Sequence, residues 1–284
     1  MTAEFNAIKR LLISGKRTTN RNPTWTRIHE ETCCGTLLGR EYQFTDSELQ
    51  RLRQHAQSFT GLDPLLDSTA GGRMYMAEKV SDEKLANDSV FGQLVVMATA
   101  GKAQVRVGGE FAQIPSGTIL SVPFDNLDLG YLHQQKIVII ENGALMPECQ
   151  HIRLPKGWED CVFVYRGHRE NIRHTQKLIE GHPAEHLGLF FDFDPAGLGM
   201  ALALGKGCIF IPEDGQELSI ALEGDINNRS AFRRQSRELS RLRDKATEIN
   251  WKSLVDWLEK KEIAIMQEHL VRRNLPLVTF DSAT

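Results

Sequence analysis

The sequence has no apolar run long enough to cross a membrane, since a membrane-spanning helix needs about 20 consecutive, predominantly apolar residues. The polar start of the chain does not resemble a secretory signal. With 284 residues, of which 41% are hydrophobic, the chain is long enough for two modest domains with their own cores. We therefore expect a soluble, cytoplasmic protein without a membrane partner.

Cysteines and histidines in the spacing of a zinc or redox site are also lacking. The sequence has five cysteines, and the adjacent Cys33 and Cys34 match no common zinc or disulfide motif. An odd number of cysteines in a cytoplasmic protein predicts reduced thiols with a structural role. His182 and His186 are four residues apart, but Pro183 between them suits only the first turn of a helix. We therefore expect no zinc site.

Positive charge is not in excess, because the formal net charge is −3. The basic residues are nevertheless segregated along the chain, and the distribution of charge matters more than its sum. Before Glu30, the only acid is Glu4, whereas the basic residues are Lys9, Arg10, Lys16, Arg17, Arg21 and Arg27. This basic N-terminal arm is a candidate DNA contact, with Lys16 and Arg17 as its predicted binding residues.

A second basic segment has a helical period. Its basic residues are Arg229, Arg233, Arg237, Arg241 and Lys245, each four residues after the last. On one continuous helix this spacing makes a single basic stripe, along which a DNA phosphate backbone fits. The alternative interpretation is a solvated helix face that is neutralised by acids elsewhere, such as Glu217 or Glu223.

Two apolar segments end in carboxylates. Glu141 follows the run 137–140, and Asp192 and Asp194 follow the run 187–191. In an open parallel sheet, ligands gather at the carboxyl ends of the strands, so three carboxylates can meet in one small volume. Oxygen ligands of this kind favour Mg²⁺ or Mn²⁺ over zinc. A purely structural interpretation also exists for Asp194, because it precedes Pro195 and suits the N-cap of a helix.

The organisation of the chain predicts two domains, residues 1–130 and 131–284. In the second, strands at 136–140, 161–165, 187–191 and 208–211 alternate with helices at 171–180 and 196–204, which predicts an α/β fold with a parallel sheet. In the first, the capping box at 45–48 begins a helix, and Gly108-Gly109 joins two short strands as a hairpin. A helix and a hairpin predict an α+β, winged-helix-like DNA-binding domain.

Three motifs in the second half resemble the Toprim domain. They are Glu141-Asn142-Gly143 after one strand, the turn at Arg166-Gly167-His168 after the next, and Asp192-Phe193-Asp194 after the third. Over roughly residues 131–270 the sequence resembles JetD/MksG, the nuclease of the Wadjet and Mks defence systems, and the A subunit of topoisomerase VI. The resemblance implies a Toprim-like parallel sheet flanked by helices.

The resemblance also implies a metal-dependent DNA endonuclease. Asp192 and Asp194 are then Mg²⁺ or Mn²⁺ ligands, and Glu141 is a ligand or the general acid/base near the 3'-oxygen. Glu268, in a Gln-Glu step similar to one near the end of JetD-like chains, is a candidate fourth acid. His168 and Arg169 are candidate phosphate contacts. The implied setting is defence against plasmid or phage DNA, with an SMC-like condensin complex as partner and a homodimer as the assembly.

Two alternatives to the nuclease remain open. A topoisomerase VI-like transesterase needs a tyrosine nucleophile, for which Tyr42 is the best candidate, although the paired tyrosines of that family are missing. A non-catalytic DNA-binding subunit with vestigial acids is the other. The presence of all three Toprim-like acids argues against the second alternative.

Overall fold

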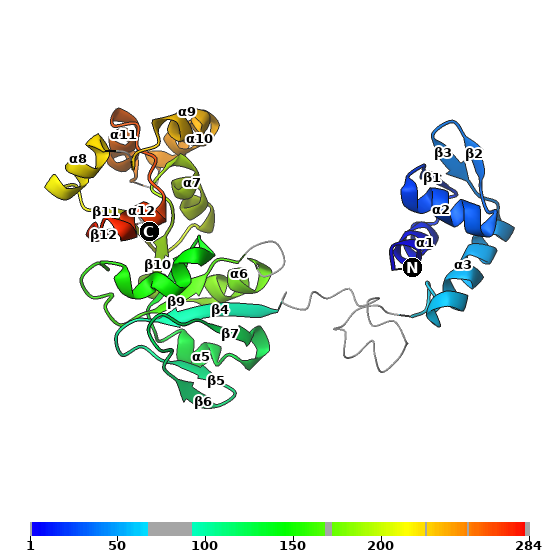
Figure 1. Cartoon of the computed structure of the whole chain (residues 1–284), viewed down its shortest axis with the longest axis horizontal. Helices are drawn as coiled ribbons and strands as arrows, with labels where there is room; N and C mark the ends of the chain where they lie inside the picture. Colours follow the sequence, from blue (N-terminus) through cyan, green and yellow to red (C-terminus); the bar gives the residue numbers. More distant parts are fainter. Residues whose placement is uncertain (1, 68–92, 168–171, 225, 249, 282–284) are drawn as a thin grey trace. The chain divides into compact units, whose positions relative to one another are not determined.

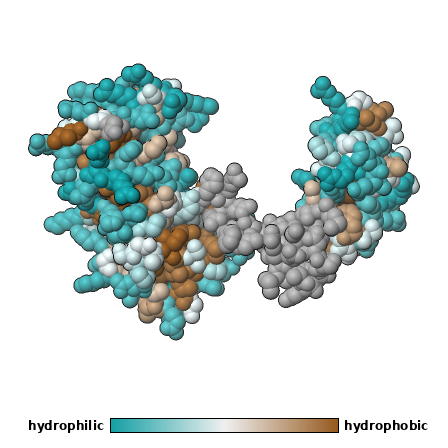
Figure 2. All heavy atoms as spheres, viewed as in Figure 1, coloured by the Kyte–Doolittle hydropathy of each residue, from teal (hydrophilic) through white to brown (hydrophobic). Residues whose placement is uncertain are grey.

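The chain forms two compact units in a computed structural model, which describes residues 2–67, 93–167, 172–224, 226–248 and 250–281 (Figure 1). Unit 1 comprises Met1–Gly92, and unit 2 comprises Gln93–Thr284. Within the described ranges, no helix is both long and apolar enough to cross a membrane. Figure 2 shows a largely hydrophilic surface, with hydrophobic residues gathered on the visible face of unit 2 near its edge strand β7 (Leu120–Pro123).

Unit 1 combines helices with a small antiparallel sheet in the strand order β1-β3-β2. Its elements are α1 (Thr2–Ser14), β1 (Thr18–Asn20), α2 (Pro23–Thr32), β2 (Thr36–Leu38), β3 (Glu41–Gln43) and α3 (Asp46–Thr60). The predicted capping box is confirmed: the Thr45 hydroxyl accepts the Glu48 N–H, and the Glu48 carboxylate accepts the Thr45 N–H. Phe5, Ile8 and Ile28 are fully buried between these elements.

Unit 2 contains a seven-stranded sheet in the order β12-β11-β10-β8-β9-β4-β7. The strands besides β7 are β4 (Leu94–Thr99), β8 (Ile137–Ile140), β9 (Val162–Tyr165), β10 (Leu187–Phe190), β11 (Cys208–Pro212) and β12 (Leu277–Asp281). β8 to β11 are parallel to one another, and β4, β7 and β12 pair antiparallel at the edges. β8, β10 and β11 are buried throughout, as expected for central strands covered on both faces. The predicted α/β class is therefore confirmed.

The helices of unit 2 precede, connect or follow the parallel strands. They are α5 (Leu129–Leu132), α6 (Ile172–Gly181), α7 (Pro195–Leu204), α8 (Gln216–Glu223), α9 (Arg229–Arg234), α10 (Ser236–Ala246), α11 (Lys252–Lys260) and α12 (Gln267–Arg272). The short helix α5 precedes β8, α6 and α7 connect parallel strands, and the other helices follow β11. Three 3-10 segments, Phe124–Asn126, Gly143–His151 and Ala184–His186, and the hairpin of β5 (Val105–Val107) and β6 (Glu110–Ala112) complete the described part of the unit. α7 ends as predicted at Gly205, whose φ of 67° favours glycine.

The predicted domain boundary between residues 130 and 131 does not match the two units. β4 pairs with the central strand β9, in the register Met97↔Val164, and β7 pairs with β4. Residues 93–130 therefore belong to unit 2, and their strands β4 and β7 are part of the large sheet. The winged helix built from the helix after the capping box and the Gly108-Gly109 hairpin is wrong as well, because α3 lies in unit 1 and β5 and β6 lie in unit 2.

Candidate functional site

The acids after β8 and β10 lie at the topological switch point of the sheet, where successive strands are added on opposite sides of β8. From β8 the chain continues to β9 on one side, whereas β10 pairs with β8 on the other. A crevice at the carboxyl ends of the strands forms at such a switch point and is where open α/β sheets bind ligands. Glu141 directly follows β8, and Asp192 and Asp194 follow β10. The structure thus brings the predicted acids to one sheet edge.

Glu141 has one oxygen near a cation and one without a partner. Its Oε1 lies 3.9 Å from Nη2 of Arg166, at the end of β9, and its side chain is 23% exposed. Its Oε2 is shielded from solvent and has no hydrogen-bond partner among the described residues. Burial raises the pKa of the Glu141 carboxyl above its ordinary value, and the Arg166 charge opposes this shift. A half-buried carboxyl with an unpartnered oxygen can hold a proton or a cation.

Asp192 is electrostatically coupled to its neighbours. Burial, the largest cause, and the negative charges of Glu141, Asp194 and Glu268 together raise the pKa of its carboxyl to about 7. The backbone N–H of Gln267 donates to Asp192 Oδ1 at 2.8 Å and opposes the shift. Four carboxyl groups are therefore close enough to repel one another.

Asp194 is held rigidly by two donors. Its Oδ1 accepts the N–H of Gly197 at 2.7 Å and so caps α7, which confirms the N-cap interpretation. Its Oδ2 accepts Nε2 of Gln235 at 2.7 Å, and the Oε1 of the same glutamine accepts the N–H of Ala196. Gly197 allows this turn, because a Cβ there would lie 2.0 Å from the Asp192 carbonyl oxygen. Asp194 is thus both a structural cap and an acid of the site.

Gln267 connects the ends of β8 and β10, and sequence reasoning missed its role. Its side chain is fully buried; Nε2 donates to the Phe190 carbonyl at 2.5 Å, and Oε1 accepts the Asn142 N–H at 3.0 Å. The sequence singles out only Glu268 in the Gln-Glu step. A signal was nevertheless present, because Gln267, Leu270 and Val271 share one face of a short helix, and a glutamine on an apolar face needs partners.

Glu268 lies beside the other acids, as expected. Its Oε1 accepts Nδ2 of Asn142, the residue that follows Glu141, and its charge contributes to the raised pKa of Glu141 and of Asp192. α12 is positioned by a two-residue antiparallel bridge, in which Phe193 N–H donates to Ile265 O at 2.8 Å and Ile265 N–H donates to Phe193 O at 3.1 Å. This bridge ties the loop with Asp192 and Asp194 to the start of α12.

The donor set suits a hard cation in its chemistry, but its present arrangement does not converge on one ion. Among the described residues, no group of three or more His, Cys, Asp or Glu side chains could hold a metal together. Hydrogen bonds hold Asp192, Asp194 and Glu268 in their present directions. A carboxylate oxygen that accepts one hydrogen bond keeps a second lone pair, so these contacts orient the acids without blocking them. The unpartnered Oε2 of Glu141 fits the same chemistry.

The predicted stripe of arginines is not on one helix. α9 and α10 are separated at Gln235, the residue that reaches Asp194, so the prediction of one continuous helix is wrong. Arg233 forms an ion pair with Glu262 at 3.0 Å. All five residues of the set, Arg229, Arg233, Arg237, Arg241 and Lys245, are exposed. His168 and Arg169 lie outside the described residues.

The basic arm and the candidate tyrosine belong to unit 1. Lys16 and Arg17 are exposed between α1 and β1, and Arg17 pairs with Asp46 at 2.8 Å, both side chains being mostly exposed. Tyr42 is 3% exposed and packs against the ring of His29, with 5.0 Å between the ring centroids. A nucleophile must reach its substrate, so its burial disfavours Tyr42 as a transesterase residue.

Comparison with known proteins identifies one family. Residues 92–279 match the model of the family described as Domain of unknown function (DUF7281). The match begins next to the start of unit 2 and contains all four acids of the site. No curated protein matches the chain.

Proposed function

We propose that this chain, which belongs to the DUF7281 family, is a metal-dependent DNA endonuclease of the Toprim type. The observation that carries the proposal is the position of Glu141, Asp192 and Asp194 after β8 and β10, on the two sides of the switch point. The Toprim-like motifs of the sequence require such neighbouring strand ends. The mutual effects of these carboxyls on their pKa values support their acting as one site.

The roles within the site follow from the environment of each carboxyl. Asp192, Asp194 and Glu268 would hold Mg²⁺ or Mn²⁺, which supplies a Lewis acid that activates water and neutralises charge on the leaving oxygen. Glu141 would be a further ligand or the general acid/base near the 3'-oxygen, and its raised pKa suits a group that carries a proton during cleavage. Arg166 would favour a phosphate beside Glu141.

The basic residues would supply affinity for the DNA backbone. Arg229, Arg237 and Arg241 are exposed on α9 and α10, and Lys16 and Arg17 are exposed in unit 1. Contacts to phosphates carry little sequence information, so binding would be largely independent of sequence and would weaken steeply with salt. Plasmid or phage DNA as target, an SMC-like condensin partner, a homodimer and a cytoplasmic location complete the proposal.

The test is cleavage of supercoiled plasmid with Mg²⁺ or Mn²⁺ by the full chain. We expect cleavage to fall to background in Glu141→Gln and in Asp192→Asn, because each change removes a carboxylate and preserves its size. Glu185→Gln is the matched control, since Glu185 is exposed and lies just before β10, at the opposite end of that strand from Asp192 and Asp194. Cleavage that survives both site variants at the level of the control would overturn the proposal.

One observation favours a second candidate, a non-catalytic DNA-binding subunit. The described acids do not converge on one ion, and the same is expected of a vestigial site. Isothermal titration with Mn²⁺, together with the plasmid assay in the presence of the partner complex, separates the two. If the wild type binds metal and cleaves plasmid, and Asp192→Asn loses both, the nuclease is supported. If the protein binds DNA but neither binds metal nor cleaves plasmid, the non-catalytic subunit is supported.

A further inference from the structure

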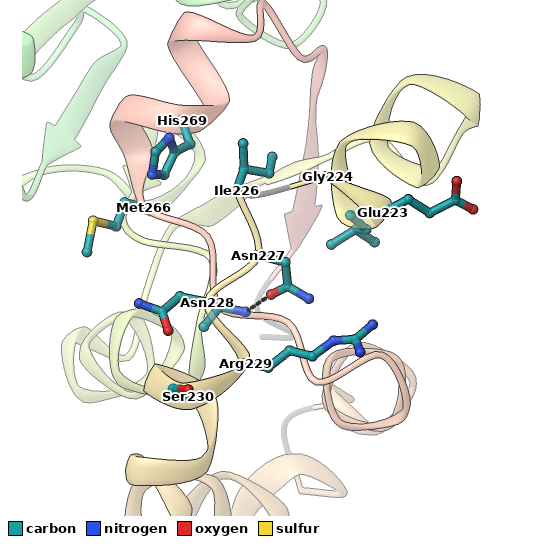
Figure 3. Close-up of a pocket in the computed structure, with 11 residues that line it drawn as sticks. Glu223, Gly224, Ile226, Asn227, Asn228, Arg229, Ser230, Met266 and His269 are labelled. Carbon is teal, nitrogen blue, oxygen red and sulfur yellow. Dashed lines mark hydrogen bonds between the residues drawn. The ribbon is translucent and has the colours of Figure 1, made fainter.

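A cavity of about 550 Å³ lies on the outer side of the segment that leads into α12. Figure 3 shows Met266 and His269 on one side of it and the residues Asn227, Asn228, Arg229 and Ser230 on the other. The first two belong to the start of α12, and the others lead from α8 into α9. None of these residues is one of the acids of the site.

Two hydrogen bonds and a backbone bridge connect the cavity to the acidic site. Asn228 N–H donates to Ala264 O at 2.9 Å, and Ala264 N–H donates to Asn227 Oδ1 at 2.9 Å. The next residue, Ile265, forms the bridge with Phe193, which lies between Asp192 and Asp194. Cavity residues also alternate with site residues along α12, where Met266 and His269 flank Gln267 and Glu268. The two places are therefore linked through the short segment between Ala264 and His269.

The lining offers mainly hydrogen-bond donors. Arg229 is exposed and forms no ion pair with any described carboxylate, in contrast to Arg233. Asn228 uses its Oδ1 to cap α9 at Ala231, which leaves its Nδ2 as a donor. Nδ2 of Asn227 is shielded and has no acceptor among the described residues. One guanidinium, two amide groups and a hydroxyl suit an anionic, oxygen-rich ligand.

The opposite wall suits a flat ring. Met266 is 49% exposed and offers a flexible, polarisable thioether on which a ring can pack, and the exposed imidazole of His269 lies next to it. The one acid of the lining, Glu223, is drawn in Figure 3 on the side away from these two residues. A charged phosphate on one wall and a ring on the other describe a nucleotide.

We propose that this cavity binds one nucleotide of an unpaired DNA strand that continues from the acidic site. The phosphate would contact Arg229 and Nδ2 of Asn227, whose side chains lie on the same side of the cavity in Figure 3, and the base would lie against Met266 and His269. The volume is in the range of pockets for small ligands and is too small for a length of duplex. Stacking on side chains combined with phosphate contacts is the usual way in which proteins bind single strands. The inference deepens the proposed nuclease function and rests on it.

The first experiment measures affinity without metal. A fluorescein-labelled thymidine oligonucleotide and a duplex of equal length are titrated with the full chain in EDTA, and anisotropy is recorded. We expect Arg229→Gln to weaken single-strand binding about tenfold, since it removes a charge-assisted hydrogen bond, and to weaken duplex binding less. Arg272→Gln is the matched control, because Arg272 is an exposed arginine at the other end of α12 and does not line this cavity. Equal losses in both variants would mean a non-specific charge effect and would overturn the inference.

The second experiment locates the base. An oligonucleotide that carries 5-iodouracil is crosslinked to the full chain by light, and tryptic peptides are identified by mass spectrometry. We expect the crosslink in the peptide 262–272, which contains Met266 and His269, and its loss in Met266→Ala. Crosslinks only to other peptides would overturn the inference. Crosslinking in this peptide without plasmid cleavage would refute only the proposed nuclease function. Plasmid cleavage without this crosslink would refute only the proposed nucleotide binding in the cavity.

Discussion

Replacing Gln267 tests whether this residue joins the two strands that carry the acids. Gln267→Leu keeps the size and the burial of the side chain but removes the donor to Phe190 O and the acceptor for Asn142 N–H. Each buried backbone group left without a partner costs about 1–3 kcal/mol. With two such groups and partial relaxation, we expect the free energy of unfolding to fall by about 2–4 kcal/mol. This is a large share of the stability of an ordinary domain.

Urea unfolding followed by tryptophan fluorescence measures this loss. Three of the four tryptophans, Trp158, Trp251 and Trp257, lie in unit 2, so the signal reports mainly on the unit that contains Gln267. The control is Gln176→Leu, because Gln176 is exposed on α6 and its replacement should change stability by less than about 0.5 kcal/mol. A difference of less than about 1 kcal/mol between the two variants would refute the bridging role.

Two further predictions concern α7 and a buried histidine. Gly197→Ala places a Cβ 2.0 Å from the Asp192 carbonyl oxygen and should lower the free energy of unfolding in urea by about 1–3 kcal/mol. In the control, Gly199→Ala on the same helix, the new Cβ meets nothing within 4 Å and should stabilise the protein by up to about 1 kcal/mol. Equal effects of the two variants would contradict the close approach at Gly197. Burial lowers the pKa of His182 from an ordinary 6.5 to about 4. Between these two pH values the unfolded chain binds more protons than the folded chain. The stability that the neutral ring contributes is therefore present above pH 6.5 and is lost as the pH falls toward 4. The loss approaches about 3 kcal/mol, and in His182→Gln the urea midpoint should depend less on pH over this range; an unchanged pH profile would contradict it.

Local sequence signals predicted the elements of the chain correctly where a few neighbouring residues decide the structure. The capping box at Thr45 and Glu48, the N-cap at Asp194 and the end of α7 at Gly205 each depend on contacts within one turn. The apolar runs that became β8 and β10 were recognised because a strand buried on both faces has no polar positions. The placement of acids after those strands followed directly.

Features that join distant parts of the chain were decided only by the tertiary structure. β4 belongs to the large sheet because it pairs with β9, and nothing within 93–99 distinguishes that pairing from a strand of a separate domain. Gln235 interrupts the arginine segment at the point where its side chain reaches Asp194, 41 residues away.

Some features of the candidate site were thus determined by the sequence, and others only by the tertiary structure. The residue types and the strand ends of Glu141, Asp192 and Asp194 were determined by the sequence itself, because periodicity and caps act over a few residues. Gln267, which links the site across 125 residues to Asn142, and the raised pKa of Asp192 were decided by the fold. Hydrogen bonds and charge repulsion act through space, and the distances they need exist only once the strands are packed side by side.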